Sequence, residues 1–166
     1  MSRPITTTVA IVAGLQTGIA NAQALAQAGA LILNGSLSAG FATLDAPRRV
    51  IVSSSGNDTG ITWTITGNQR PELGGQVVAE TIAGANAGDA QSTQDFGTVT
   101  SIVGSGATAG TVTAGTNGVA SGPLVLWDQQ FQVFAVSIAG FVLSGAPTWQ
   151  VDYTYDDPFG TWQPNG

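Results

Sequence analysis

The stretch I-T-W-T-I-T, residues 61–66, decides the fold, because apolar and polar side chains alternate along it without a break. Side chains two positions apart lie on the same face of an extended strand. Ile61, Trp63 and Ile65 therefore share one face, and the three threonines share the other. This pattern predicts a β-strand with one buried face, and it places Trp63 in the core.

The residues in front of this strand predict its connection. G-N-D-T-G at 56–60 is dense in turn-forming residues, and the run at 49–54 has a β-branched centre typical of a strand. Two strand-like runs joined by a short glycine-containing turn are the usual signature of a hairpin. Residues 49–66 are therefore predicted to form a β-hairpin.

Strand-like runs recur along the rest of the chain, separated by turns rich in the 23 glycines. Frequent short strands with little helical signal between them are typical of a β-sandwich or barrel. We expect an all-β protein: one β-sandwich over residues 31–166, with a jelly roll as the variant topology. The further strands are expected at residues 76–83, 96–103, 110–115, 124–127, 131–142 and 148–155.

The first 30 residues differ from this pattern, and they are expected to form an N-terminal arm, residues 1–30. Alanine and glutamine in I-A-N-A-Q-A-L-A-Q-A favour a short helix near 19–28, whereas Gly14 and Gly18 oppose an early start. An extended arm that leads into a strand at 30–33 is the equal alternative. The apolar run near the start is too polar for a membrane span, and a cleaved signal peptide is not favoured.

Composition excludes several classes of function. The 166-residue chain of 16.7 kDa has no cysteine and no histidine, so thiolate chemistry, imidazole bases and the usual zinc ligands are missing. It has no lysine, and a net charge of −6 gives no basic surface for nucleic acid. Charged residues make up 8% and hydrophobic residues 43%, which predicts a surface largely covered by protein partners.

The adjacent acids Asp156 and Asp157 are the strongest candidates for chemistry. Adjacent side chains on an extended chain point to opposite sides, so the two carboxylates cannot easily flank one bond. Pro158 follows them, and Asp-Pro is a turn signal. Their expected role is to end a strand. No calcium-loop spacing and no activated nucleophile is present, so we expect no enzyme, cofactor, metal site or small-molecule substrate.

The large aromatic residues divide into two groups. Trp63 and Trp149 lie on alternating faces expected to point inward, whereas Trp127, Phe159 and Trp162 lie near predicted strand ends. Large aromatic residues in such positions often anchor protein interfaces. We predict core positions for the first pair and protein contact for the second group. The alternative is a flat row of exposed rings that binds sugars.

Three other residues complete the predicted interface. Phe131 opens the run 131–142, which is apolar on both faces and fits either a buried central strand or one that carries an interface. Arg48 and Arg49 form the chain's one basic doublet. Arginine suits interface ion pairs, so the doublet could meet acids on a neighbouring subunit; the equal alternative is a solvated strand start.

A series of phrases resembles a family of tailed-bacteriophage virion structural proteins. The phrases are L-N-G-S-L at 33–37, T-L-D-A-P-R-R-V-I-V-S-S-S-G-N-D-T-G-I-T-W-T-I-T-G at 43–67, E-T-I-A-G-A-N-A-G at 80–88, F-G-T-V-T-S-I-V-G-S-G-A-T-A-G-T-V-T-A-G-T at 96–116 and D-Y-T-Y-D-D-P-F at 152–159. The resemblance covers roughly residues 30–160 and carries no catalytic signature.

The resemblance implies a capsid cement or decoration protein on the outside of the virion. Such a protein would bind the major capsid protein at junctions between subunits and would itself be a dimer or trimer. Two alternatives stay open: a neck or tail component of the virion, and a secreted carbohydrate-binding module. No nucleic acid and no membrane are expected as partners.

Overall fold

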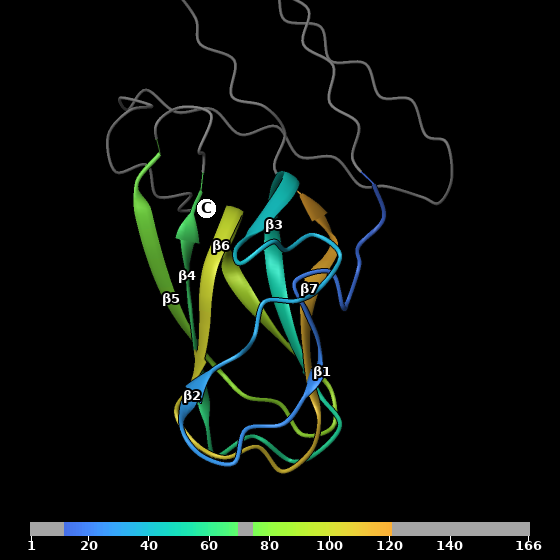
Figure 1. Ribbon diagram of the computed structural model, residues 1–166, viewed down its shortest axis with the longest axis vertical. Coiled ribbons are helices and arrows are strands. Elements are labelled where there is room, and N and C mark those ends of the chain that lie inside the picture. Colours follow the sequence, from blue (N-terminus) through green and yellow to red (C-terminus); the bar gives the residue numbers. More distant parts are fainter. Residues whose placement is uncertain (1–11, 70–74, 121–166) are drawn as a thin grey trace, which may run out of the picture. The chain divides into compact units, whose positions relative to one another are not determined.

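The computed structural model describes residues 12–69 and 75–120, here called the β domain. They belong to the first of two compact units, whereas the second unit, Leu124–Gln163, lies outside the described residues. The β domain is all-β, as expected, and contains no helix (Figure 1). Its strands are β1 (Ala20–Gln23), β2 (Gly29–Ala30), β3 (Ala42–Ser54), β4 (Thr62–Asn68), β5 (Val77–Ala83), β6 (Asp89–Gly104) and β7 (Val112–Ala120).

All seven strands belong to one antiparallel sheet that does not close into a barrel. Along the sheet the order is β1-β7-β3-β6-β4-β5, and β2 pairs with the end of β6. The two longest strands, β3 and β6, lie side by side in the middle. This sheet is consistent with the predicted β-sandwich, because β6 takes part in both of its halves.

The central strand β6 has to bend sharply. Its first residue, Asp89, pairs with Ser53, and its last, Gly104, pairs with Trp63. A straight strand of 16 residues would be roughly 50 Å long. The chain from Ser53 to Trp63 spans roughly 35 Å at most. Figure 1 accordingly shows β6 rising, turning and descending, with both of its ends at the same end of the β domain.

Irregular pairing marks the place where the sheet turns. Residues 44–47 of β3 lie opposite Gly97 alone, and residues 92–94 of β6 lie opposite Val50 alone. Residues 117–119 of β7 likewise lie opposite Arg49 alone. Extra residues on one strand are β-bulges, which bend the strand and increase its twist. The three bulges converge on β3 between Pro47 and Val50, so that stretch forms the corner of the sheet.

Residues 49–66 form two strands, as predicted, but not a hairpin. β3 and β4 are both antiparallel to β6 and lie on opposite sides of it, so they run parallel to each other. Their connection is anchored by Asp58, which is 2% exposed. The Asp58 carboxylate accepts hydrogen bonds from Ser54 Oγ at 2.5 Å and from the Ala109 amide at 2.7 Å. A turn-rich sequence therefore serves here as a crossover between the two halves of the sheet.

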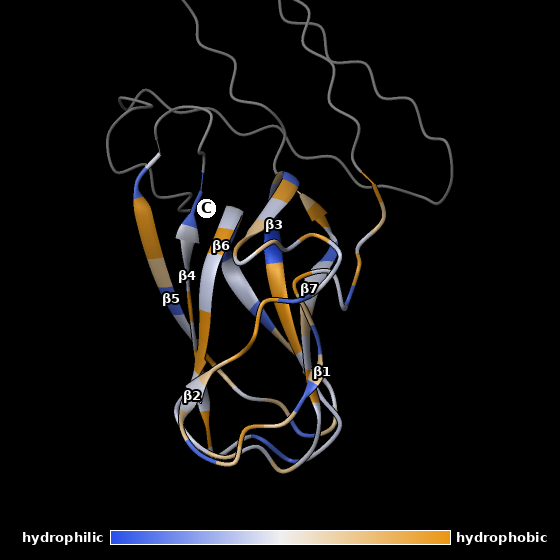
Figure 2. Cartoon of the chain, in the orientation of Figure 1, coloured by the Kyte–Doolittle hydropathy of each residue, from blue (hydrophilic) through white to orange (hydrophobic). Residues whose placement is uncertain are grey.

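The predicted alternation of β4 is confirmed. Trp63 and Ile65 are 1% and 0% exposed, whereas the threonines between them are partly or fully exposed. The core gathers the inward faces of β3, β4, β6 and β7, and Figure 2 shows an orange apolar stretch on β3 beside a blue hydrophilic band. Its fully buried larger side chains include Ile19, Val50, Val52, Trp63, Ile65, Phe96, Val99, Ile102 and Val112.

The N-terminal segment takes the extended alternative. No helix forms at 19–28; instead β1 pairs with β7, and β2 pairs with β6. Tertiary contacts override the local helical propensity here. Ile19 is fully buried, and the Leu31 amide donates to the Ile102 carbonyl at 2.8 Å. The division of the chain between residues 30 and 31 stays a prediction, although β1 and β2, on its N-terminal side, pair with the sheet.

Three further predicted strands are confirmed. The runs at 76–83, 96–103 and 110–115 correspond to β5, to the second half of β6 and to the start of β7. β6 begins earlier than predicted, because the small residues Ala90 and Ser92 take its buried positions. The runs at 124–127, 131–142 and 148–155 lie outside the described residues, as do Trp149, Asp156 and Asp157.

Candidate functional site

Of the six predicted interface residues, the β domain contains only Arg48 and Arg49. Trp127, Phe131, Phe159 and Trp162 lie outside the described residues, and their interface role stays a prediction. The two arginines have different surroundings. Arg48 is 1% exposed, whereas the Arg49 side chain is 39% exposed. Arg48 therefore does not take the solvated position that was its alternative, and its interface role stays a prediction.

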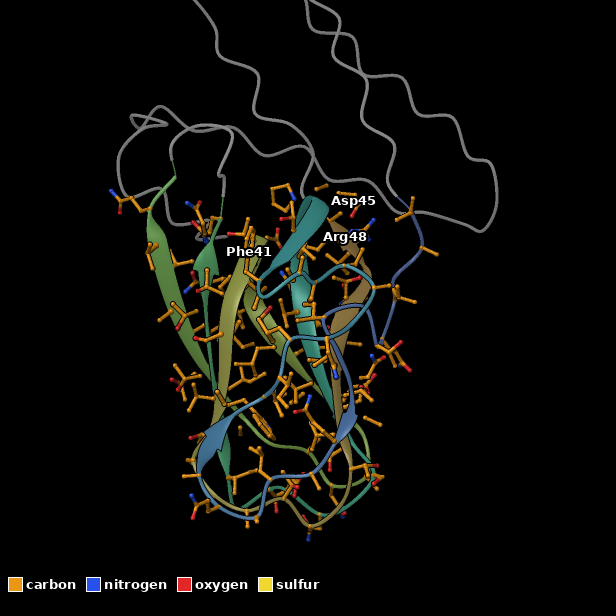
Figure 3. All side chains as sticks on the ribbon, in the orientation of Figure 1. Phe41, Asp45 and Arg48 are labelled. Atoms are coloured by element: carbon orange, nitrogen blue, oxygen red, sulfur yellow. The ribbon has the colours of Figure 1, made fainter. Side chains whose placement is uncertain are left out.

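Arg48 forms a bidentate ion pair with Asp45 (Figure 3). Arg48 Nε donates to Asp45 Oδ1 at 2.6 Å, and Nη2 donates to Oδ2, also at 2.6 Å. Forked guanidinium–carboxylate pairs are both directional and strong, because two charged hydrogen bonds form together. This pair satisfies one side of the guanidinium.

The rest of the Arg48 guanidinium binds two backbone carbonyls. Nη2 donates to the Val12 carbonyl at 2.6 Å, and Nη1 donates to the Asn117 carbonyl at 3.2 Å. The Val12 amide in turn donates to Asp45 Oδ2 at 3.2 Å. Together these four residues form the Arg48 junction. A buried charge needs such complete pairing, because its desolvation is costly.

The regular alternation of β3 turns Arg48 inward. Ala46 and Pro47 belong to the extra residues opposite Gly97, and proline removes a backbone donor at a point where no ladder bond is made. The burial pattern nevertheless keeps its two-residue period from Ala42 to Ser54, so Arg48 faces the interior like Val50 and Val52. Asp45 lies three residues earlier, on the other side of the bend, within reach of the guanidinium.

The junction lowers the pKa of the Asp45 carboxyl below its ordinary value of 3.8. The main cause is the hydrogen bond from the Arg48 side chain, which favours the ionised form. Partial burial acts in the opposite direction, and the hydrogen bond from the Val12 amide lowers the pKa further. Asp45 thus stays charged at neutral pH, as the paired guanidinium requires.

The junction joins parts of the β domain that are distant in the sequence. Val12 lies before β1, and Ala120, the last residue of β7, pairs with Arg48. Asn117 belongs to the β7 bulge just before that point. Within the described residues, the junction thus links Arg48 to parts of the chain 36 and 69 residues away.

Arg49 makes a weaker contact. Its Nε lies 3.7 Å from Asp95 Oδ1, which is an ion pair but too long for a hydrogen bond. Surface pairs of this kind contribute little to stability, since water and salt screen them. Arg49 keeps enough exposure for a partner to reach it, so its interface role stays a prediction.

Exposed apolar side chains accompany the junction. Val12 is 60% exposed, and Val119, next to the last residue of β7, is 47% exposed. Phe41, directly before β3, is 51% exposed, and Figure 3 shows it at the same end of the β domain as Asp45 and Arg48. Trp63 and Phe96 are buried, so Phe41 is the exposed aromatic ring of the described residues. These side chains suit contact with protein better than reaction chemistry.

The other buried or bonded acids serve the fold. Glu80 on β5 accepts hydrogen bonds from the Thr93 and Gln94 amides at 2.7 and 2.9 Å, so its carboxylate covers the β6 bulge. Asp89 accepts a hydrogen bond from Ser53 Oγ at 2.5 Å. Within residues 12–69 and 75–120, no group of three acidic side chains could hold a metal ion. No helix of the described part is long and apolar enough to cross a membrane.

Sequence reasoning missed the roles of Asp45, Asp58 and Glu80. Each accepts hydrogen bonds from residues far away in the chain, so no local pattern marks them. Asp45 has the one readable signal: an acid three residues before an arginine, with a proline between them. That spacing is consistent with a side-chain pair across a bend.

No family model matches the chain, and comparisons with curated proteins and with solved structures also find no match.

Proposed function

We propose that this chain is a structural protein of a bacteriophage virion: a cement or decoration protein that binds the major capsid protein. The proposal begins from the sequence phrases that resemble virion structural proteins. The observation that carries it in the structure is the corner of the β domain. There, exposed apolar side chains surround a junction whose charged groups are already paired within the chain.

The acids of the β domain support a binding role over catalysis. Asp45, Asp58, Glu80 and Asp89 each accept hydrogen bonds from their own chain, three of them from backbone amides. Carboxylates used in this way hold strands and loops together. A general acid or base needs instead a group aimed at a substrate. The proposed protein has no substrate and acts by contact alone.

The apolar corner offers the physical means of binding. Burial of exposed Phe41, Val12 and Val119 against a partner would release ordered water and favour association. A protein that binds only the assembled shell stabilises the shell, because binding shifts the equilibrium toward the assembled state. A dimer or trimer at each capsid junction would present several such corners at once and raise the avidity.

A reconstitution experiment tests this function. Purified protein is added to virions prepared without it, and the bound amount is measured after sedimentation. Saturable binding at a fixed ratio to the major capsid protein is expected. Phe41→Ser should reduce this binding severalfold, whereas the matched exposed variant Val103→Ser, on β6, should not. Equal binding by both variants, with both still folded, would remove Phe41 from the interface.

The two alternatives predict other results. A neck or tail component would bind intact particles at very few sites. A carbohydrate-binding module would bind no particles, and it would need exposed rings, of which the β domain offers Phe41 alone.

A further inference from the structure

We infer that Asn117-Gly118 is a site of spontaneous deamidation, and that the fold protects the second Asn-Gly pair of the β domain, Asn34-Gly35. In this reaction the backbone nitrogen of the glycine attacks Cγ of the asparagine. A five-membered imide closes, and the side-chain nitrogen leaves as ammonia with the proton of the attacking amide. Water then opens the imide to give an aspartyl or isoaspartyl residue.

Glycine after asparagine favours the attack, because no side chain obstructs the nitrogen and the backbone can reach the required conformation. The two pairs therefore share the same intrinsic chemistry, and the fold decides between them. Deamidation needs a mobile backbone, a side chain turned toward the next residue and access for water. Each of these conditions can be compared at the two sites.

The surroundings of Asn117-Gly118 provide access for water and a side chain turned toward the next residue. Residues 117–119 form the β7 bulge, outside the regular pairing with β3. Gly118 is exposed, and a Cβ placed on it would meet nothing within 4 Å. The Val119 amide donates to Asn117 Oδ1 at 2.8 Å. This bond turns the side chain toward the backbone that follows it and draws electrons from Cγ.

The surroundings of Asn34-Gly35 oppose the reaction. The Gly35 amide, which would have to attack, donates a hydrogen bond to the Ile19 carbonyl at 3.0 Å. Gly35 is buried, and a Cβ there would collide with the backbone of Thr17 and Gly18. The Asn34 side chain is turned away, since its Oδ1 accepts from the Asn21 amide at 2.9 Å. Reaction at Asn34 therefore requires local opening of the fold.

Deamidation at residue 117 would change the Arg48 junction. The Asn117 carbonyl accepts from Arg48 Nη1 at 3.2 Å, and Asn117 Nδ2 donates to Gln91 Oε1 at 2.8 Å. An isoaspartyl linkage adds a carbon to the backbone beside that carbonyl. Either product replaces the amide donor with a carboxylate next to Gln91. The reaction would therefore weaken the hydrogen bonds of Asn117 to Arg48 and Gln91 as the protein ages. This effect does not depend on the proposed function.

The test follows both sites in one sample. The folded full-length protein is incubated in mildly alkaline buffer, digested under acidic conditions and sequenced by mass spectrometry, which locates each amide that has become a carboxyl group. We expect residue 117 to react severalfold faster than residue 34. The same incubation in urea should bring the two rates together, because the protection of Asn34 depends on the fold.

The variant Gly118→Ala provides the control. Space is open at this position, and its backbone conformation suits any residue, so the variant should fold normally. Its reaction at residue 117 should be severalfold slower, with residue 34 unchanged. Equal rates at the two sites in the folded protein, or a rate at residue 117 that Gly118→Ala does not lower, would overturn the inference.

Discussion

At the scale of single residues, Arg48 links three parts of the β domain that are distant in the sequence. Its guanidinium binds Asp45 from its own strand, the Val12 carbonyl near the N-terminus and the Asn117 carbonyl on β7. A buried arginine is favourable only when its bonds are all made. Loss of one partner therefore leaves the other groups without compensation.

Replacement of Arg48 by leucine should lower the free energy of unfolding by about 3 kcal/mol, the lower end for a broken buried ion pair, because Asp45 is partly exposed. Arg49→Leu is the matched control and should change the free energy by less than about 1 kcal/mol. Urea unfolding followed by circular dichroism measures both. Similar losses in the two variants would show that the burial of Arg48 has no energetic role.

Asp45 should make stability depend on pH. Its pKa is lowered in the folded state, so its contribution is complete above the ordinary carboxyl range and is lost as the pH falls through the folded-state pKa. Asp45→Asn should be less stable than the original protein at neutral pH, and the difference should shrink in acid. A difference that stays constant from neutral to acidic pH would contradict this assignment.

At the scale of elements, the bulges turn one sheet into two packed halves. β3 and β6 each carry extra residues near the same corner. On β6, Ser92 Oγ accepts from the Val50 amide at 2.9 Å and donates to the Gln94 carbonyl at 2.8 Å. The buried Ser92 hydroxyl thus makes the hydrogen bonds that a backbone group would make in a regular ladder.

Ser92→Ala should destabilise the protein by about 1–3 kcal/mol, because the buried Val50 amide loses its acceptor. The exposed Ser36→Ala serves as the control and should stay within about 0.5 kcal/mol of the original. Hydrogen exchange provides a second measurement, in which the Val50 amide should exchange faster only in the Ser92 variant. If the Val50 amide exchanged equally slowly in Ser92→Ala, Ser92 Oγ would not be the acceptor that protects it.

The elements differ in how far the sequence could predict them. The alternation at 61–66 is local, so the buried face of β4 could be predicted from residues two apart. The partners of β3 could not, since its pairing depends on contacts such as Val50–Ser92, 42 residues apart. The same limit applies to Arg48: alternation places it inward, but its acceptors at Val12 and Asn117 are 36 and 69 residues away. Asn-Gly pairs are visible in the sequence, but only the fold separates Asn34 from Asn117.

At the scale of the whole molecule, the β domain is a charge-poor unit with exposed apolar side chains at the corner that holds the Arg48 junction. The polar groups at this corner are paired with each other, and the apolar groups around them are exposed. That division fits a protein which binds through one end and keeps its own fold independent of binding. The proposed role on a phage capsid follows from this division together with the sequence resemblance.

The most direct test of this role is the number of copies per virion, measured by quantitative mass spectrometry of purified particles relative to the major capsid protein. A cement or decoration protein should be present in numbers comparable with the capsid protein. A very small fraction of that number would instead indicate a neck or tail component. Complete absence from the particles would contradict the proposed virion role.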